Sequence, residues 1–389
     1  MGFSLYVHVP FCKRICTYCD FPRVLLPDPN GMGQDEVSAT FSIMNAGLRS
    51  LPPALRETPV STVFFGGGTP SCVPPARIAA VLDTARAALT LEAGAEISLE
   101  GNPEDVTPAW IDAMRAAGVN RFSLGVQSFT CAGPLGRRHT PQRALEAVGQ
   151  LRAAGIVNIN LDLMFALPDQ GPLELHRDLD ELIALQPEHV SCYGLTLAPQ
   201  TPLARDYAAG RYTFPDDEAW IDLYRIVQER LRAAGYAQYE ISNWARPGFE
   251  CRHNLRIWEG ADYLGIGPGA VSRWKRWRWT ESADPVEYRR RAQGCAWPQE
   301  GPPPWVAASE VVNDAGADIE TLLTGTRLLR GFELGRLHGR LPEECICDLR
   351  TKGLLWQTGG RVGLTPTGLP LADSVLAQLV DALRGPEES

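Results

Sequence analysis

The stretch Leu5-Tyr6-Val7-His8-Val9-Pro10-Phe11-Cys12-Lys13-Arg14-Ile15-Cys16-Thr17-Tyr18-Cys19 decides how the rest of the chain is organised. Its first five residues are mostly apolar and predict a buried β-strand, and three cysteines follow close behind at C-x3-C-x2-C spacing. Three thiolates on one short loop suit a cubane cluster of four irons, because three irons are held and one stays open to a small ligand. The sequence therefore predicts a [4Fe–4S] site with Cys12, Cys16 and Cys19 as its protein ligands.

Other interpretations of these cysteines stay open. A zinc ion held by the three thiolates would need a fourth protein ligand to complete its tetrahedron, and Asp20 and His8 are the nearest candidates. Thiols without a metal would be small buried side chains, and a disulfide between two of them would leave the third unpaired. The dense spacing favours the iron–sulfur interpretation.

The composition is that of an ordinary globular protein. Of 389 residues, 44% are hydrophobic and 21% are charged, which allows one large domain and a smaller one. A net charge of −9 disfavours contact with nucleic acid, which needs a basic face. No apolar run approaches the roughly 20 residues of a membrane span. The remaining cysteines have no regular spacing and no signal peptide is visible, so we expect a cytoplasmic location.

Short apolar runs alternate with segments of helical spacing over the first 241 residues. The expected strands are Leu5–Val9, Thr62–Phe65, Glu96–Glu100, Arg121–Val126, Asn158–Met164 and Val190–Leu195. The expected helices are Gln34–Ser50, Pro75–Leu89, Pro108–Ala117, Pro141–Ala154, Leu173–Leu185 and Asp216–Ala234. Because the strands read as near-continuous apolar runs, we expect a parallel sheet that is buried on both faces and wrapped by helices.

Six strand–helix units fall short of the eight that close a full barrel. The expected fold class is therefore α/β, with a partial, TIM-like (β/α)6 barrel over residues 1–241 and the chemistry at the C-terminal ends of its strands. A doubly wound sheet is the alternative, but the G-x-G-x-x-G that it would carry after the first strand is absent. Residues 242–304 are rich in glycine and tryptophan and predict an irregular connecting region. Residues 305–389 predict a smaller, mainly helical domain with a β-turn element at Leu354–Leu364.

The residues around the cysteine loop carry a resemblance to a known family. Cys12-x3-Cys16-x2-Cys19, with Tyr18 before the third cysteine, resembles the signature of the radical S-adenosylmethionine (SAM) superfamily. With Tyr6-Val7-His8-Val9-Pro10-Phe11 before it and Asp20-Phe21 after it, the segment is similar to the oxygen-independent coproporphyrinogen III oxidase branch, and more closely to its haem-chaperone members. The oxidases carry a further cysteine where this chain has Phe21. The resemblance implies a cluster whose open iron is chelated by SAM, and a winged-helix-like C-terminal domain.

A glycine-rich turn follows the second expected strand, in Phe64-Phe65-Gly66-Gly67-Gly68-Thr69-Pro70-Ser71. Three successive glycines let a ligand approach the backbone closely and leave several N–H groups as donors, although such a run can also be only a tight turn. The turn resembles the family's GGGTP segment, and the resemblance implies that Gly67, Gly68 and Thr69 contact SAM.

Polar residues at the ends of later strands also match the family. Glu100 ends the third strand, where a carboxylate suits an ammonium or a ribose but can also cap a helix. A carboxylate embedded in the apolar fifth strand, Asp162, must have a partner because burying it alone is costly. The resemblance assigns cofactor binding to these two residues and to Tyr6, Gln127 and Arg137. Arg138 is the alternative to Arg137, because the segment before them is shorter than usual.

A second motif lies near the start of the region rich in glycine and tryptophan. Cys251-Arg252-His253-Asn254-Leu255-Arg256-Ile257-Trp258 resembles the H-N-x-x-Y-W motif of the haem chaperones, with Ile257 where tyrosine is usual. The resemblance makes His253 the candidate axial ligand of haem, and a histidine bonded to the backbone is the alternative. Many relatives have a histidine where this chain has Val271. Nearby, Arg273-Trp274-Lys275-Arg276-Trp277-Arg278-Trp279 suits a porphyrin, a membrane surface or single-stranded nucleic acid, or is simply a strand with one charged face.

The motifs together resemble a radical SAM haem chaperone over residues 4–275. The implied cofactors are a [4Fe–4S] cluster, SAM and haem, and the implied partner is a haem-acceptor protein. Transient contact with a membrane surface is a further expectation, and nucleic acid is not an expected partner. Two alternative functions are an oxygen-independent coproporphyrinogen III oxidase and a radical SAM methyltransferase of the same branch. The sequence leaves the oligomeric state and catalytic turnover open.

Overall fold

The computed structural model describes residues 2–26, 33–131, 133–137 and 139–385 and is dominated by one curved sheet of twelve strands. Across the sheet, the strands are β14 (Ala308–Val311), β13 (Trp277–Thr280), β12 (Val271–Trp274), β11 (Tyr263–Ile266), β1 (Phe3–Val9), β4 (Val60–Gly67), β5 (Leu91–Gly101), β6 (Arg121–Gln127), β7 (Ile159–Phe165), β8 (His189–Gly194), β10 (Asn243–Ala245) and β9 (Ala237–Glu240). Strands β11, β1 and β4 to β8 run parallel, and the others are antiparallel. The six predicted strands and the partial barrel are thus confirmed.

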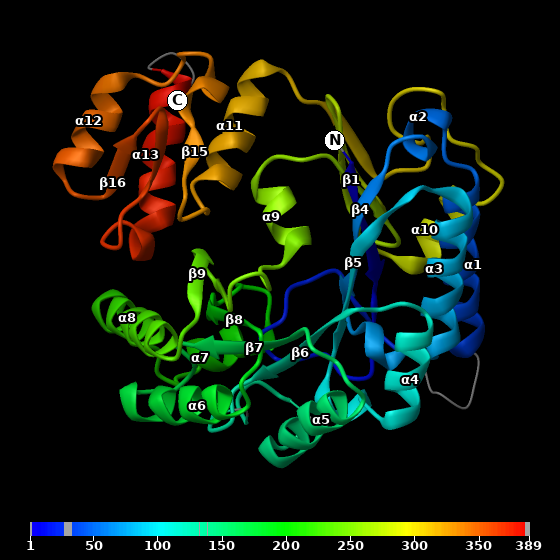
Figure 1. Ribbon diagram of the computed structural model, residues 1–389, viewed down its shortest axis with the longest axis horizontal. Coiled ribbons are helices and arrows are strands. Elements are labelled where there is room, and N and C mark those ends of the chain that lie inside the picture. Colours follow the sequence, from blue (N-terminus) through cyan, green and yellow to red (C-terminus); the bar gives the residue numbers. More distant parts are fainter. Residues whose placement is uncertain (1, 27–32, 132, 138, 386–389) are drawn as a thin grey trace.

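Helices cover the convex side of the curved sheet, as Figure 1 shows. They are α1 (Gly33–Arg49), α3 (Pro75–Ala88), α4 (Pro108–Ala116), α5 (Pro141–Ala153), α6 (Pro172–Ala184) and α8 (Asp217–Ala233), and the shorter α2 (Pro53–Arg56), α7 (Pro202–Ala208) and α10 (Pro285–Ala292) lie in the connections. Helices α4 and α5 begin with a threonine whose side chain accepts a backbone N–H of the first turn, followed at once by proline. That local chemistry explains why the predicted helix starts are confirmed there.

The barrel strands alternate between an apolar and a polar side, which corrects the prediction that both faces are apolar. Leu5, Val7 and Leu99 point outward and are fully buried in the core beneath the helices. The intervening positions point into the barrel, where they form the lumen wall. These inward residues are largely polar, and include Ser4, Tyr6, His8, Thr62, Glu96, Ser98, Glu100, Arg121, Ser123, Asn160, Asp162, His189, Ser191 and Tyr193. Parallel strands with two packed faces usually read as apolar throughout, so this polar alternation marks a lumen.

The region 242–304 is more regular than predicted. Its strand β11 pairs in parallel with β1 and extends the sheet, and β12 and β13 form a hairpin rather than the single strand predicted over Arg273–Trp279. Trp279 in that hairpin is buried, and both Arg273 and Arg278 form ion pairs with Glu320. The tryptophans and two of the arginines of this segment are therefore engaged in contacts within the protein, whereas Lys275 and Arg276 at the turn are exposed.

The short helix α9 (Arg252–Trp258) lies on the concave side of the sheet, opposite the covering helices (Figure 1). It contacts the first residues of β1 and β4, whereas the cysteine loop follows the last residues of β1. We call the two ends of the lumen the α9 end and the mouth. The mouth is formed by the C-terminal ends of β1 and β4 to β8, where parallel barrels place their chemistry.

The C-terminal region contains α11 (Asp314–Gly325), α12 (Glu343–Thr351) and α13 (Ala372–Arg384) with a small antiparallel sheet of β15 (Phe332–Glu333), β17 (Arg361–Leu364) and β16 (Leu355–Thr358). Gly359 and Gly360 form the β16–β17 turn with φ values of 57° and 80°, which glycine adopts without strain. Among the described residues, no helix is long and apolar enough to cross a membrane. The division of the chain into three domains stays a prediction.

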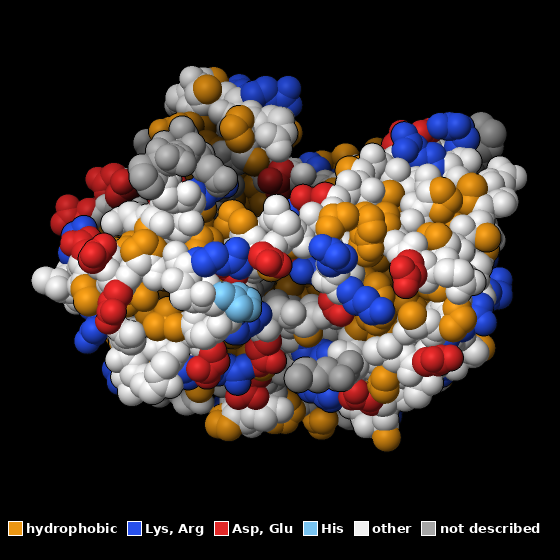
Figure 2. Space-filling model, turned by 90° about the horizontal axis from the view of Figure 1, so that it is seen from above, with side chains coloured by type: hydrophobic (Ala, Val, Ile, Leu, Met, Phe, Trp, Pro, Cys, Tyr) orange, Lys and Arg blue, Asp and Glu red, His pale blue; other side chains and the backbone are white. Residues whose placement is uncertain are grey.

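The surface in Figure 2 carries basic and acidic side chains intermixed on the face shown. Contact with a nucleic-acid backbone needs a continuous basic area, and this face offers charges of both signs side by side. The picture agrees with the net charge of −9.

Candidate functional site

The cysteine loop is closed at its neck by two short strands, β2 (Phe11–Cys12) and β3 (Val24–Leu25), which pair in parallel. The N–H of Val24 donates to the carbonyl of Pro10 at 2.8 Å, and the N–H of Leu26 donates to the carbonyl of Cys12 at 2.7 Å. Inside the loop, the N–H of Cys19 donates to the carbonyl of Cys16 at 3.3 Å. The backbone therefore presents all three thiols from one compact loop at the mouth.

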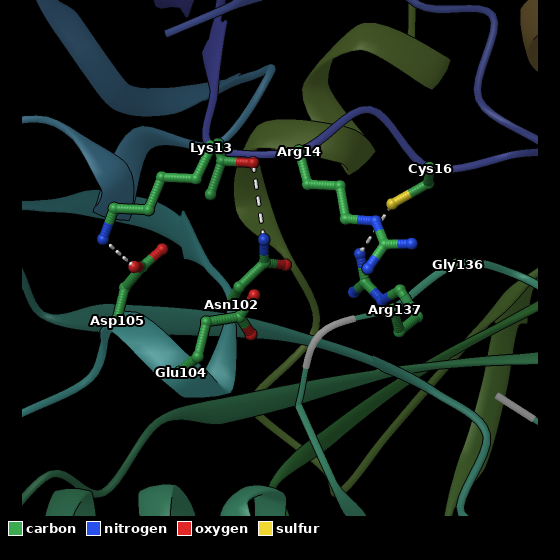
Figure 3. A pocket seen from close by; sticks show the side chains of 9 residues that line it. Lys13, Arg14, Cys16, Asn102, Glu104, Asp105, Gly136 and Arg137 are labelled. Atoms are coloured by element: carbon green, nitrogen blue, oxygen red, sulfur yellow. Dashed lines mark hydrogen bonds and ion pairs between the residues drawn. The ribbon is translucent and has the colours of Figure 1, made fainter. Parts of the chain in front are cut away.

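Polar side chains from neighbouring strands reach two of the three sulfurs. The hydroxyl of Thr69 donates to Cys12 Sγ at 3.4 Å, and the guanidinium of Arg137 donates to Cys16 Sγ at 3.5 Å. Asn102 donates in turn to the Thr69 hydroxyl at 3.4 Å, and Figure 3 shows Asn102, Arg137 and Cys16 around one small pocket. Donors aimed at sulfur stabilise the thiolate form that binds iron.

Burial raises the pKa of the Cys12 thiol to about 11, and the neighbouring Cys19 and Cys16 add to that rise. Burial also raises the pKa of Cys19. Burial thus disfavours the thiolate form of Cys12 and Cys19, and a cation bound at the sulfurs compensates that charge, as iron would. The donor set and its electrostatics fit an iron–sulfur cluster.

The zinc alternative finds less support from the positions of the possible ligands. Within residues 2–26, 33–131, 133–137 and 139–385, no three His, Cys, Asp or Glu side chains are grouped closely enough for one metal ion. Both ring nitrogens of His8 already have partners, the Tyr6 hydroxyl at 3.0 Å and the carbonyl of Pro22 at 2.8 Å. His8 is therefore not free to complete a tetrahedron in this arrangement.

Residues that the sequence did not single out hold the loop in place. Thr17 donates through its hydroxyl to the carbonyl of Pro134 at 2.6 Å and through its N–H to the carbonyl of Leu135 at 3.3 Å. Arg23 donates to the carbonyls of Cys19 and Phe21. On the other side, Lys13 forms an ion pair with the buried Asp105 at 2.5 Å (Figure 3). The only sequence signal for this anchoring was the presence of basic residues, Lys13 and Arg23, within and after the cysteine motif.

The glycine-rich turn serves the protein's own packing, which corrects the expectation of freely available N–H donors. Gly67 has a φ of 110°, and a Cβ there would lie 2.6 Å from the His8 ring. A Cβ at Gly68 would lie 2.7 Å from the carbonyl oxygen of Phe11. The N–H of Gly68 donates to Val9, and the N–H of Thr69 donates to Phe11, each at 2.8 Å. Their contact with SAM stays a prediction.

Two carboxylates that the sequence predicts for the site, Glu100 and Asp162, face the same lumen. Burial, followed by the charge of Asp162, raises the pKa of Glu100 to about 8, although a backbone N–H of Gly67 opposes the rise. Burial also raises the pKa of Asp162, which accepts a hydrogen bond from Asn160 at 2.7 Å. Asp162 therefore has a polar partner, as predicted from the cost of burying a lone carboxylate in an apolar strand.

The end of β6 brings Gln127 and Arg137 together. Gln127 adopts a φ of 70°, unusual for a residue other than glycine, where the β6–β7 register shifts. The Arg137 guanidinium donates to the carbonyl of Gly125, and a Cβ on Gly125 would meet the side chains of both Arg137 and Gln127. The structure thus places these two side chains together beside Cys16. Arg138 lies outside the described residues.

His253 lies apart from the mouth, at the α9 end, where it is buried with 3% of its surface exposed. Its Nδ1 lies 2.9 Å from the hydroxyl of Thr62, and that hydroxyl donates to Ser4 at 3.0 Å. Nδ1 must therefore carry the proton, and Nε2 keeps its lone pair. Burial, aided by nearby arginines, lowers the pKa of His253 to about 3, so the ring is neutral at neutral pH.

Helix α9 is fastened to the barrel by a carboxylate from another strand. Glu96 of β5 accepts hydrogen bonds from the N–H of Arg252 at 3.0 Å and from the N–H of His253 at 3.2 Å. It thereby caps the start of a helix whose N-cap residue, Cys251, makes no side-chain capping hydrogen bond. This link was not predictable from the sequence, because Glu96 is far from α9 along the chain.

Comparison with known proteins places these features in a family. A model described as the radical SAM superfamily matches residues 6–182. The chain is 37% identical to the haem chaperone HemW of Mycobacterium tuberculosis strain H37Rv, over 97% of this chain and 95% of that protein. It is 41% identical to the haem chaperone HemW of Escherichia coli K12, over 69% of each.

The fold has a close counterpart among solved structures. The radical SAM enzyme coproporphyrinogen III oxidase HemN from Escherichia coli superimposes with a TM-score of 0.81, covering 97% of this chain and 90% of that one, at 20% identity. At that identity the likeness concerns the fold alone, whereas the identity to HemW extends over nearly the whole of both chains. This chain belongs to the HemW family of radical SAM proteins.

Proposed function

We propose that this protein is a haem chaperone, which binds haem and passes it to an acceptor protein. The observation that carries the proposal is the 37% identity to the haem chaperone HemW of Mycobacterium tuberculosis, which covers both chains almost completely. The free state of all ten cysteines supports the expected cytoplasmic location. The hairpin that suggested contact with a membrane surface packs its tryptophans against the core and pairs Arg273 and Arg278 with Glu320. Only its turn, with Lys275 and Arg276, is exposed for such contact.

Membership of the radical SAM superfamily implies a [4Fe–4S] cluster and SAM. Cys12, Cys16 and Cys19 would hold the cluster, which when bound supplies an electron to SAM. Thr69 and Arg137 donate to the sulfurs and stabilise their ionised form. The predicted SAM contacts Glu100, Gln127 and Asp162 line the lumen below the loop, where their polar groups can bind and orient a ligand.

The chemistry of His253 suits a haem ligand, but its position is enclosed. The bond to Thr62 fixes the proton on Nδ1 and leaves Nε2 as the ligating atom, which is the arrangement that metal-binding histidines use. The ring packs against Phe64 at 5.0 Å and Tyr6 at 6.4 Å between ring centroids. Haem iron therefore reaches Nε2 only if α9 moves, which would open its link to Glu96 and the hydrogen bonds of Arg256 to Gly2 and Ser4.

Titration with haemin tests the proposal. We expect a saturable Soret band whose position shifts in His253→Ala, because removing an axial imidazole changes the ligand field of the iron. His338→Ala is the matched control, because His338 is a largely exposed histidine outside the barrel, and it should titrate like the wild type. Equal spectra for the wild type and His253→Ala would show that His253 is not a ligand of the haem iron.

The alternative functions make opposite predictions in one further assay. Phe21, which stands where the oxidases have a cysteine, is 62% exposed beside the cysteine loop. We expect no conversion of coproporphyrinogen III under reducing, anaerobic conditions with SAM. Observed decarboxylation would overturn the chaperone proposal in favour of an oxidase. Absence of haem binding, together with SAM-dependent methylation of another molecule, would favour the methyltransferase.

A further inference from the structure

The lumen wall contains a buried arginine without a direct partner. Arg121 begins β6, points into the barrel and is 2% exposed. Its Nε is enclosed without a hydrogen-bond partner. In the part of the chain that the structure describes, the guanidinium makes neither a hydrogen bond nor an ion pair.

The polar groups nearest to Arg121 are already occupied by other partners. Glu96 accepts the backbone N–H groups that begin α9, and Asp162 accepts from Asn160. The Tyr239 hydroxyl lies 2.7 Å from Nε2 of His189, whose Nδ1 must donate to the side-chain oxygen of Asn160 at 2.6 Å. The Tyr239 hydroxyl therefore donates to His189 and accepts from the N–H of Cys251 at 3.3 Å. The charges of these groups stabilise the protonated form of Arg121, but none of the groups forms a direct bond to it.

A guanidinium stays protonated in a protein and carries five donors in a planar fork. Burying such a group without hydrogen bonds is costly, and most buried charges are paired for that reason. Every other charged side chain of the inner wall, Glu96, Glu100 and Asp162, accepts at least one hydrogen bond. The unsatisfied donors of Arg121 therefore call for a ligand that enters from the lumen.

The lumen between Arg121 and the mouth is open to solvent. Tyr193, which points inward from β8, keeps 39% of its surface exposed, whereas the outward-pointing Cys192 on the same strand keeps 1%. Tyr6, Phe64, Glu100 and Asp162 on the inner wall also keep accessible surface. The wall thus combines aromatic faces with two carboxylates, and a ligand entering at the mouth can reach down between them.

We propose that Arg121 is the receptor for the carboxylate of an organic acid that occupies the lumen. A carboxylate matches the planar fork of a guanidinium and accepts two parallel hydrogen bonds from it. A single negative charge also suits the wall better than a phosphate dianion, because Glu100 and Asp162 face the same space. The aromatic faces of Tyr6, Phe64 and Tyr193 would contact the apolar body of the acid.

Two sources can supply this carboxylate. One is the propionate side chain of a porphyrin, and this version rests on the proposed function. The other is a small organic acid that has no connection with haem. Both would place a carboxylate on Arg121, and they differ in the size of the attached body.

Sodium propionate is the first probe. Millimolar propionate should raise the thermal unfolding midpoint of the wild type by a few degrees beyond sodium chloride of equal ionic strength, because ligand binding stabilises the folded state. The extra rise should vanish in Arg121→Gln. Arg225→Gln, which removes an exposed arginine on α8, is the matched control and should behave like the wild type. Arg121→Lys keeps the charge without the fork and should retain only part of the rise, and it decides the test if Arg121→Gln does not fold.

Haemin and its dimethyl ester form the second pair of probes. If a porphyrin propionate is the source, the wild type should bind haemin about tenfold more tightly than the ester, since a bond to a charged group is worth a factor of that order. Arg121→Gln should bind both equally. A response to propionate through Arg121 without any haemin binding would leave the carboxylate site standing and reject the proposed function. The carboxylate proposal is overturned if propionate gives no rise beyond chloride and the two porphyrins bind the wild type equally, as expected if only buried water meets Arg121.

Discussion

At the mouth of the barrel, the groups that matter stand on one short loop and its immediate neighbours, whereas at the α9 end they come from the first residues of several strands. Cys12, Cys16 and Cys19 belong to a single motif, and Thr69 and Arg137 reach their sulfurs from the ends of two strands. His253, Thr62 and Glu96 meet at the other end although they are distant in the sequence.

The two ends also differ in how completely their groups are satisfied. The mouth presents three thiols on one loop, and burial raises the pKa of two of them, Cys12 and Cys19, so a bound cation would favour their ionised form. At the α9 end, carboxylate, histidine and tyrosine are joined by hydrogen bonds, and Arg121 is the exception. The mouth is therefore suited to a bound cofactor, whereas the α9 end is a closed hydrogen-bond network in which the guanidinium of Arg121 is the charged group that has no partner among the described residues.

The largest expected effect is the loss of iron from the mouth. Replacing Cys12, Cys16 and Cys19 with alanine should lower the iron content after anaerobic reconstitution from about four atoms per chain to nearly none, because no other loop offers three thiolates. Iron analysis and the visible spectrum measure this. Retention of iron by the triple variant would show that the cluster lies elsewhere.

A glycine at the mouth gives the next largest effect. In Gly68→Val the new Cβ would lie 2.7 Å from the Phe11 carbonyl, so the strand end must shift away from the cysteine loop. We expect a loss of about 2 kcal/mol in the free energy of unfolding, measured by urea denaturation, together with loss of iron. Gly149→Val, in α5 with open space around the glycine, is the control for adding the same side chain. Equal stability of the two variants would contradict the packing role of Gly68.

At the α9 end, weakening the cap should free the helix without disturbing the mouth. Glu96→Gln removes the charge that accepts the N–H groups of Arg252 and His253, at a cost of about 1 kcal/mol. Amide hydrogen exchange over 252–258 should become faster, while iron content stays at the wild-type level. Glu146→Gln, at an exposed position on α5, is the control. A parallel loss of iron would show that the two ends are not separate.

A further expected effect is a pH dependence of the stability that arises in the lumen. The pKa of Glu100 is raised to about 8 in the folded protein, so between its ordinary value and that pH the folded state holds a proton that the unfolded state has lost. The free energy of unfolding should therefore fall as the pH rises from about 4.5 to 8, with this group contributing at most about 1.4 kcal/mol per pH unit. Glu100→Gln should flatten the slope. An identical pH profile for both proteins would contradict the burial of Glu100 in the lumen.

The parts of the fold set by local sequence were predictable. The strand and helix positions of the barrel followed from apolar periodicity and from threonine and proline at the helix starts. The polar inner wall was present in the sequence as alternation, at Ser4, Tyr6 and His8 for example, but the apolar content of the strands obscured it. The extension of the sheet by β11 was not predictable, because pairing with β1 joins segments at opposite ends of the barrel region.

The candidate site divides in the same way. The cysteines, Thr69 and Arg137 lie together at the mouth. Spacing alone indicated the cysteines, whereas the resemblance to the family implied Thr69 and Arg137. The anchoring of the loop by Thr17 and the cap on α9 by Glu96 depend on tertiary contacts that leave no local pattern. Arg121 reads in the sequence as an ordinary first residue of a strand. Only its burial without a partner distinguishes it.

Haemin titration of the triple cysteine variant tests most directly whether haem binding at the α9 end is independent of the cysteine loop at the mouth. The variant without Cys12, Cys16 and Cys19 should still give a saturable Soret band. Adding His253→Ala should shift this band as it does in the wild-type background. Loss of haem binding in a folded triple variant would place the haem ligands at the cysteine loop. A band indifferent to His253 would show that the iron is ligated by another residue, and either result would contradict a separate haem site at the α9 end.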